Sequence, residues 1–426
     1  MRIAIHEVRV IDPFRQLDQV QDLWIEDGLL VDHLGGPADR EISGQGLWAF
    51  PGLIDVHTHL RDPGQTYKED IISGTRAASR GGYVLVCAMP NTSPVCDSPE
   101  IVRYMIDKAE AEGFAQVLPI AAASLGEEGQ SLSPYAALKA AGAGGLTDDG
   151  RPLANSALLL SCLQEAAKHD LPLIDHPEDS DLARGKAMNA GPVASRLGLS
   201  GMPRAAETVC VARDILLSLE YKLPIHLCHL SCQESVDLLA WAKSLGAPVT
   251  ADTCPHYFLL TEEAVAQKGA KAKMYPPLRR EQDRQAILQA VLDGTVEMIS
   301  TDHAPHSPEE KGPDLALAKN GIVGLEHAFA LSHKYLHVEQ KMPLLDLLAR
   351  FTLAPAQLLK LGDRSLRVGQ PANLCLFNPQ LPETIDPANF FSKGRNTPFA
   401  GMTTAGAICF TFWQGKITYE RATHLC

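Results

Sequence analysis

The chain has 426 residues, of which 45% are hydrophobic and 21% are charged, so it can bury a large core and is not globally disordered. Its net charge is -13, and Lys and Arg form no cluster, which argues against nucleic acid as a partner. No apolar run is long enough to cross a membrane, and the first residues lack the apolar core of a signal peptide. We therefore expect a cytoplasmic protein that does not contact membranes.

Both ends of the chain predict short β-strands. In residues 1–51, apolar and β-branched residues alternate with polar ones between Gly and Asp residues, and residues 365–426 show a similar pattern. Neither segment can bury its apolar face alone. We expect the two segments to combine into one small β-sandwich domain.

The middle of the chain, residues 52–364, alternates short apolar runs with longer stretches whose apolar residues have helical spacing. There are eight runs: GLIDVHTHL, YVLVCAMP, QVLPIAAAS, AGAGGLTDD, LPLIDHP, PIHLCHLS, PVTADTCPH and VEMISTDHAP. Several of the helical stretches end in Gly, as helix C-termini often do. The pattern predicts an α/β fold, a catalytic (β/α)8 TIM barrel.

Most of these runs end in His, Asp or Asn, although fully buried parallel strands are continuously apolar. In a barrel such residues meet at the C-terminal rim, where active sites lie. Four histidines and two carboxylates arriving at one rim indicate a metal site. The candidate ligands are His57, His59, one of the neighbouring Asp148 and Asp149, His176, His229 and Asp302.

The spacing of the candidate ligands along each strand shows which of them can share one face. His57 and His59 are two residues apart on a strand and share one face, so they can bind one cation such as Zn²⁺. His226 and His229 face opposite sides, and His229 lies nearer the end of its run. In GGLTDDG (144–150), which alone is typical of a turn, only one of Asp148 and Asp149 can face the rim.

The ten cysteines have no regular spacing. Cys228 and Cys232 are the nearest pair, and a thiol metal site is one interpretation of them. We favour reduced, mostly buried cysteines in a cytoplasmic protein.

Five segments carry a resemblance to a known family: DVHTHLRDPG (55–64), MPNT (89–92), TDDG (147–150), STDHAPH (300–306) and NTPFAG (396–401). Together they resemble the dihydroorotases, and more closely the bacterial class I enzymes of the amidohydrolase superfamily. The similarity extends through nearly the whole chain. The HxH pair with Asp302 is shared by the superfamily, whereas the combination of the other segments is much narrower.

The resemblance implies two Zn²⁺ ions per chain. His57, His59 and Asp302 would hold one, His176 and His229 the other, and Asp149 would bridge them together with a hydroxide, which would be the nucleophile. Asp302 would be the general acid and base. The residues at the substrate-binding positions are His59, Arg61, Asn91, Tyr275, His306, Asn320 and Gly321.

The activity that the resemblance implies is the reversible cyclisation of N-carbamoyl-L-aspartate to dihydroorotate in pyrimidine synthesis. The substrate is a small anion, and Arg61 could bind a carboxylate in two-pronged fashion. The alternative for Arg61 is a local ion pair with Asp62. We expect a homo-oligomer (a dimer) and leave association with aspartate transcarbamoylase open.

Two substrate-binding positions depart from the family pattern. Tyr275 stands in KMYPPLR where class I relatives usually read KMNPPLR, and Asn320-Gly321 stands where they usually have Phe-Gly. The metal chemistry is unaffected, but the argument for the substrate is weaker. Tyr275 could offer a hydroxyl or fill the pocket. The segment Ser307–Asn320 is either a mobile loop over the mouth or a plain connection.

Other functions have their own sequence signatures. Allantoinases, hydantoinases and dihydropyrimidinases usually bridge their metals with a carboxylated lysine on the fourth strand, but residues 141–149 contain no lysine, and Lys139 precedes them in a helical stretch. A non-catalytic dihydroorotase-like partner of aspartate transcarbamoylase would have lost metal ligands, and every ligand position here is filled. Both comparisons favour an active, Asp-bridged dihydroorotase.

Overall fold

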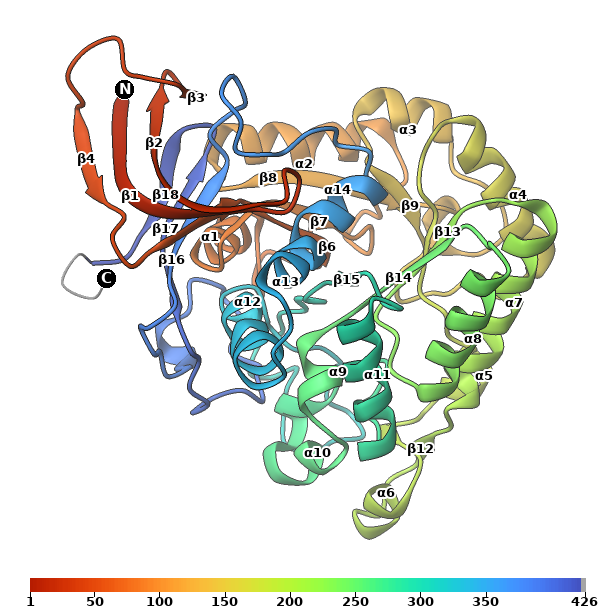
Figure 1. Cartoon of the computed structure of the whole chain (residues 1–426). Helices are drawn as coiled ribbons and strands as arrows, with labels where there is room; N and C mark the ends of the chain where they lie inside the picture. Colours follow the sequence, from red (N-terminus) through yellow and green to blue (C-terminus); the bar gives the residue numbers. More distant parts are fainter. Residues whose placement is uncertain (423–426) are drawn as a thin grey trace.

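The computed structural model describes residues 1–422 and contains a strand barrel surrounded by helices, with a separate sheet at one side (Figure 1). The barrel strands are β6 (Leu53–Thr58), β7 (Tyr83–Ala88), β8 (Gln116–Ala122), β9 (Gly145–Thr147), β10 (Ile174–Asp175), β13 (Ile225–Leu227), β14 (Val249–Thr253) and β15 (Met298–Ile299). Each lies in one of the eight predicted apolar runs. The TIM barrel is therefore confirmed.

The barrel closes through two single bridges. Its strands pair in parallel within two groups of four, β6-β7-β8-β9 and β10-β13-β14-β15. Parallel bridges Leu146↔Leu173 and Thr58↔His303 join the groups at the two seams. All eight strands therefore point their carboxyl ends toward the same rim.

Helices cover the outside of the barrel (Figure 1). The longer ones are α1 (Ile71–Arg80), α2 (Pro99–Glu112), α3 (Tyr135–Ala141), α4 (Ser156–Lys168), α7 (Ala205–Tyr221), α8 (Gln233–Ser244), α11 (Glu281–Asp293) and α13 (Leu344–Phe351). Local sequence sets their ends. Asp70 caps α1 by accepting from the Ser73 backbone N–H, and Gly142 ends α3 with a left-handed φ of 107°.

The shorter elements include an excursion that the sequence did not predict. After β10 the chain forms α5 (Ser180–Ala183), β11 (Met188–Asn189), α6 (Pro192–Arg196) and β12 (Gly201–Met202) before α7 begins. The remaining short helices are η1 (Leu125–Glu127), α9 (Pro255–Leu259), α10 (Glu263–Lys268), η2 (Gly269–Ala272), α12 (Ala328–Ser332), η3 (His333–Glu339), α14 (Leu353–Leu358) and η4 (Pro387–Asn389).

The two ends of the chain form one eight-stranded sheet. Its strands are β1 (Arg2–Asp12), β2 (Leu17–Glu26), β3 (Leu29–Val31), β4 (Arg40–Ser43), β5 (Trp48–Pro51), β16 (Leu374–Asn378), β17 (Ala407–Trp413) and β18 (Lys416–Glu420). The order is β18-β17-β16-β5-β1-β2-β3, and β4 pairs with β1. Antiparallel pairing of β5 with β16, with Phe50 opposite Cys375, joins the two ends as expected.

The sheet has a core of its own and a second core that it shares with the barrel. The shared core contains Phe50 and Phe377 of the sheet and Phe329 and Phe351 of the barrel helices. The ring centroids of Phe329 lie 5.0 Å from those of Phe50 and 5.2 Å from those of Phe377. The sheet therefore packs directly on the barrel.

Two findings concern the rest of the described chain. In residues 1–422, no helix is both long and apolar enough to cross a lipid bilayer. The nine cysteines in this range are buried and form no disulfide, while Cys426 lies outside the described residues.

Candidate metal centre and substrate pocket

The six predicted metal ligands lie together at the carboxyl end of the barrel. His57 lies in β6, one residue before its end, and His59 follows the strand. The others lie just beyond the ends of their strands: Asp149 after β9, His176 after β10, His229 after β13 and Asp302 after β15. All six are at most 6% exposed. The strand ends therefore converge as the sequence predicted.

Asp149 lies between two pairs of imidazoles. Its Oδ1 atom is 3.2 Å from His176 Nδ1, 3.4 Å from His57 Nε2 and 3.8 Å from His229 Nε2, while its Oδ2 atom is 3.4 Å from His59 Nε2. One carboxylate thus faces both pairs, as a bridging ligand must.

Asp302 completes the first of these groups. Its Oδ1 atom is 3.1 Å from His59 Nε2 and 3.6 Å from His57 Nε2. Two ligand atoms about 2.1 Å from one tetrahedral Zn²⁺ lie roughly 3.4 Å apart. The observed separations therefore match ligands that share a cation.

Unsatisfied polar atoms support the fit of a metal pair. Both ring nitrogens of His57 and the Nδ1 atom of His229 are buried and have no hydrogen-bond partner within residues 1–422. Buried polar atoms normally have a partner, because leaving one without costs free energy. Imidazoles and carboxylates are among the ligands that bind divalent ions such as Zn²⁺ in proteins.

The charges of the centre are coupled. Burial acts to lower the pKa of His57, but the carboxylates of Asp149 and Asp302 raise it to about 9. Burial acts to raise the pKa of Asp302, but the hydrogen bond from His59 and the charge of His57 lower it to about 2. The carboxylates are therefore ionised at neutral pH, which is the state that binds a cation.

Two buried aspartates that the sequence analysis did not single out hold the rim in place. Asp55 accepts from the His57 backbone N–H at 3.1 Å and from the Thr301 hydroxyl at 2.6 Å. Asp252 accepts from the His229 backbone N–H at 3.0 Å and from the Ser300 hydroxyl at 2.6 Å. Both therefore tie a ligand-bearing strand end to the residues just before Asp302.

These contacts support unusual backbone conformations. His229 and Asp302 have φ values of 35° and 44°, in the left-handed region that side chains rarely adopt. His226 does not reach the centre, because its Nε2 atom lies 2.8 Å from Asp252 and its Nδ1 atom 2.8 Å from the Thr250 hydroxyl. Asp148 instead accepts from the backbone N–H of Ser124 at 2.9 Å.

A pocket of about 380 Å³ opens over the centre. Its walls include all seven residues predicted to contact substrate: His59, Arg61, Asn91, Tyr275, His306, Asn320 and Gly321. Glu178 and Lys319, which the sequence analysis did not single out, also line it. The predicted substrate residues are thus brought together in one cavity.

Arg61 brings a positive charge into this pocket. It is 8% exposed, and within residues 1–422 its Nε atom is buried without a hydrogen-bond partner and its guanidinium makes no ion pair. Asp62, the alternative partner, instead lies 2.7 Å from Lys108 and accepts from the Tyr104 hydroxyl at 2.8 Å. The pairing of Arg61 with Asp62 is therefore wrong, and the guanidinium is available to an anion.

Asn91 and His306 contact protein groups as well as the pocket. Asn91 Oδ1 lies 2.9 Å from His59 Nδ1, which fixes the orientation of that imidazole. His306 has its Nδ1 atom 3.0 Å from Glu310 and its Nε2 atom 2.7 Å from the Asn320 carbonyl oxygen. Burial and the nearby Arg61 lower the pKa of His306 to about 3.

The two residues that depart from the family pattern form the wall of the pocket. The Tyr275 hydroxyl donates to the Lys186 carbonyl, and Tyr275 packs against the buried cluster of Ala183, Met202 and Ala206. The amide oxygen of Asn320 is buried without a partner. Gly321 has a φ of 142°, and a Cβ there would lie 2.7 Å from the Ala304 carbonyl oxygen, so only glycine fits.

The segment after β15 is held by two lysines. Lys311 Nζ donates to the carbonyls of Lys273, Lys319 and Gly321 at 3.0, 2.8 and 3.0 Å. Lys273 Nζ donates to the carbonyls of Leu315 and Ala318 at 2.6 and 2.7 Å. The segment is therefore bonded in place beside the pocket, which its charged composition did not reveal.

The chain resembles known proteins over its full length. The model of the Dihydro-orotase-like family matches residues 46–235. Dihydroorotases from Desulforapulum autotrophicum and Desulfotalea psychrophila are 42% and 44% identical to it, and each comparison covers 99% of this chain and 100% of the relative. The chain belongs to the dihydroorotase family.

Solved structures show a similar fold. The L-hydantoinase from Arthrobacter aurescens matches with a TM-score of 0.88 at 21% identity, covering 99% of this chain and 96% of that chain. The dihydropyrimidinase from Brevibacillus agri matches with a TM-score of 0.86 at 21% identity, covering 99% and 95%. In this dihydroorotase family member, Lys139 lies on α3 and its ammonium donates to the Asp170 carbonyl, away from Asp149.

Proposed function

We propose that the chain is a dihydroorotase of the bacterial class I type, which interconverts N-carbamoyl-L-aspartate and (S)-dihydroorotate in pyrimidine synthesis. The observation that carries the proposal is Asp149, whose two oxygens face both histidine pairs beside the unpaired Arg61. Full-length relatives named dihydroorotase support the same conclusion. A cyclic amide hydrolase with this site would act on a small anionic substrate.

We assign the six rim ligands to two Zn²⁺ ions. His57, His59 and Asp302 would hold one ion, His176 and His229 the other, and Asp149 both. When bound, such ions would supply a water whose pKa is lowered from about 15.7 to about 7 and a Lewis acid for the amide carbonyl. With two dications the centre carries a net positive charge, which favours an anionic substrate.

The protein residues would bind the substrate and move the proton. The Arg61 guanidinium would bind the substrate carboxylate with two hydrogen bonds and so fix the ring in the pocket. Asp302 Oδ1 faces the imidazoles of His57 and His59, so Oδ2 is the atom left to exchange a proton. In ring opening it would take the proton of the attacking water and pass it to the ring nitrogen.

The remaining pocket residues would shape the space around the ring. The Tyr275 hydroxyl already donates its hydrogen to the Lys186 carbonyl oxygen, so it would not donate a hydrogen bond to the substrate. Its ring would instead close one wall and exclude water. His306 would hold the Asn320–Gly321 backbone against the opposite wall through its contact with the Asn320 carbonyl.

We also propose a division of the chain into domains. Residues 52–364 would form the catalytic barrel, and residues 1–51 with 365–426 the accessory β domain. The pairing of β5 with β16 supports this division.

Hydrolysis of dihydroorotate, allantoin and hydantoin, measured side by side with metal analysis, tests the function. We expect activity with dihydroorotate, and cyclisation of N-carbamoyl-L-aspartate, to exceed the other activities by orders of magnitude. A preference for hydantoin or allantoin would overturn the substrate assignment. A metal-free, inactive protein that bound aspartate transcarbamoylase would identify a non-catalytic partner instead.

Asp149→Ala provides the matching variant. The substitution removes the carboxylate that faces both histidine pairs, so we expect loss of activity and of at least one metal ion per chain. Asp148→Asn is its control, because Asp148 bonds to Ser124 rather than to the imidazoles. Full activity in Asp149→Ala would contradict the bridging role.

A further inference from the structure

The segment NTPFAG (396–401) carries part of the family resemblance, but neither the metal ligands nor the substrate contacts include any of its residues. It lies between β16 and β17, in the region of the chain that follows the barrel. Its first residue, Asn396, is nevertheless only 3% exposed. A side-chain amide that is this buried needs hydrogen-bond partners for both its oxygen and its nitrogen.

The partners of Asn396 are backbone groups that follow β15. The amide nitrogen donates to the carbonyl oxygens of Ala304 and Gly321, at 2.9 and 3.0 Å. The amide oxygen accepts from the His306 backbone N–H at 3.1 Å. The backbone carbonyl of Asn396 accepts from the Val323 N–H at 3.0 Å. One residue of the accessory region therefore bonds to four residues at the rim of the barrel.

These bonds hold the two ends of one loop. The loop begins after His306 and returns to the rim at Gly321, and the amide group of Asn396 bonds to both of these residues. The Ala304 N–H donates to the Ile322 carbonyl oxygen at 2.9 Å, so the two ends also bond to each other. Asn396 therefore lies at the base of the loop and fixes one end relative to the other.

The residues before Asn396 are fitted to the same place. Buried and exposed residues alternate from Ser392 to Asn396. A Cβ on the buried Gly394 would lie 2.7 Å from the Cβ of Pro305, so only glycine allows the chain to pass this close to the loop base. The Ser392 hydroxyl donates to Glu69, which is fully buried. The segment that carries Asn396 is thus seated firmly on the rim.

The residues that Asn396 holds form part of the substrate pocket. Ala304, His306 and Gly321 all line the cavity of about 380 Å³, whereas Asn396 does not. Within residues 1–422, the hydrogen bonds of Asn396 go to none of the six candidate metal ligands. A change at Asn396 should therefore move the wall of the pocket and leave the metal centre as it is.

We propose that Asn396 is a positioning residue for substrate binding, which acts through the backbones of His306 and Gly321. The inference rests on the proposed function, because it takes this pocket as the place where the cyclic amide binds. It adds that the region after the barrel takes part in substrate binding, although Asn396 itself does not line the pocket.

Asn396→Asp tests the proposal with a side chain of nearly the same shape. The carboxylate can still accept from His306, but it cannot donate to the two carbonyl oxygens, and its charge repels them. We expect KM for dihydroorotate to rise on the order of 10–100-fold. Because the loss concerns binding of the substrate as a whole, kcat should stay within about threefold of wild type. Metal content should not change.

Asn389→Asp is the matched control, because Asn389 lies exposed in the same stretch between β16 and β17. It should behave as wild type. A merely structural role of Asn396 would reduce the fraction of active protein, which lowers the apparent kcat and leaves KM unchanged. That result in Asn396→Asp, or kinetics equal to wild type, would overturn the proposal.

Hydrogen exchange gives a second test that needs neither substrate nor activity. In the wild-type protein the His306 amide should exchange more slowly than the amide of the exposed Glu309 in the same loop. In Asn396→Asp, exchange at residues 304–306 and 321–323 should be faster than in wild type. Equal exchange at His306 and Glu309 in wild type, or no change in the variant, would contradict the positioning role. Wild-type protein that failed to open dihydroorotate would instead refute the proposed function, and hydrogen exchange would still decide the role of Asn396.

Discussion

Arg61 shows how a single residue can indicate the kind of ligand that a pocket binds. A buried guanidinium is normally paired, because an unpaired buried charge is costly. Arg61 has no ion pair in the described chain, while the neighbouring Asp62 is taken by Lys108. The Arg61 guanidinium is therefore available to bind an anionic group of a ligand in the pocket.

Arg61→Met should weaken substrate use without removing metal. Hydrogen bonds to charged groups contribute about 1.5–3 kcal/mol, so losing the bidentate contact should lower kcat/KM by on the order of 10–100-fold. Steady-state kinetics with dihydroorotate measures the change. Arg61→Lys should fall between, because it keeps the charge but not the planar fork. The exposed Arg103→Met is the control, and an unchanged kcat/KM in Arg61→Met would exclude the carboxylate contact.

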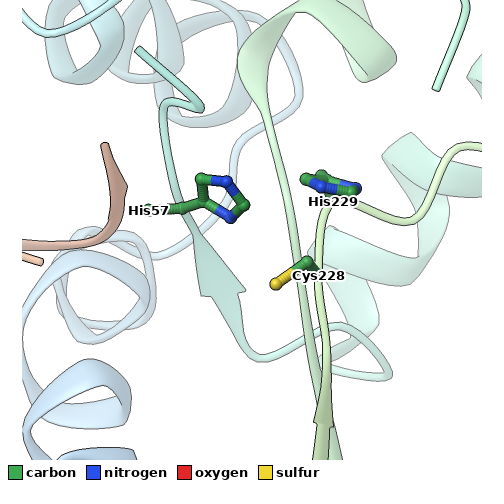
Figure 2. A group of neighbouring side chains, drawn as sticks. All are labelled: His57, Cys228 and His229. Atoms are coloured by element: carbon green, nitrogen blue, oxygen red, sulfur yellow. The ribbon is translucent and has the colours of Figure 1, made fainter. Parts of the chain in front are cut away.

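At the scale of single residues, sequence reasoning succeeded where a strand is regular and failed where it is not. The two-residue spacing placed His57 and His59 on one face, and the nearness of His229 to its strand end selected it over His226. Adjacent residues on a regular strand face opposite ways, yet Cys228 Sγ and a ring nitrogen of His229 lie within 4.8 Å of each other (Figure 2). The φ of 35° at His229 breaks the alternation, and no sequence pattern reveals such a turn.

At the scale of the elements, hydrogen bonds to buried aspartates connect the carboxyl ends of neighbouring barrel strands. Asp252 holds His229 by its backbone and Ser300 by its hydroxyl, so β13, β14 and β15 are fixed relative to one another. An aspartate inside an apolar run was visible in the sequence. Its partners were not, because they come from strands distant along the chain.

Asp252→Ala should weaken cation binding at the proposed metal centre while leaving the six candidate ligands in place. Loss of an outer support typically lowers metal affinity by on the order of 10–100-fold. Competition with a chelator measures this affinity. Thr250→Val is the control, since it removes the other partner of His226 and leaves the His229 backbone bond intact. Equal affinities in the two variants would contradict a special role for Asp252.

The loop after β15 is a second element whose role depends on contacts that composition does not show. Three carbonyls converge on the Lys311 ammonium, and one of them belongs to Gly321 in the pocket wall. A charged sequence with Gly and Pro fits both a mobile loop and a fixed one. Bonds from a side chain to backbone carbonyls have no sequence signature.

Lys311→Met should disorder the wall formed by Asn320 and Gly321. Buried carbonyls left without a donor cost about 1–3 kcal/mol each, so we expect KM to rise on the order of 10-fold with a smaller change in kcat. Lys271→Met, at an exposed lysine near the same segment, is the control. Kinetics that match wild type in Lys311→Met would show that the loop needs no such support.

At the scale of the whole molecule, the terminal sheet and the barrel share one core. Eight apolar runs were enough to predict the barrel, and matching strand patterns at both ends predicted that they combine. The excursion from α5 to β12 escaped prediction because its strands have only two residues each. Its contact with Tyr275 is one reason that the sequence left the role of that residue open.

Phe377→Ala should destabilise the sheet and the barrel together. Truncating a buried phenylalanine costs about 3–5 kcal/mol, and Phe377 packs against Phe329 and Phe50 across the junction. Denaturant unfolding followed by fluorescence and by activity should give coincident transitions at a lower midpoint. Val20→Ala, at an exposed sheet position, should leave the midpoint unchanged. Two separate transitions in wild type would show that the sheet and the barrel unfold independently.

The central claim is that two cations at the Asp149 centre make this chain a dihydroorotase. The most direct measurement is the rate of dihydroorotate ring opening while the metal-free protein is titrated with Zn²⁺. We expect no activity without metal and a rise to a plateau that requires at least two equivalents per chain. Full activity in the metal-free protein, or no ring opening at any loading, would contradict the account.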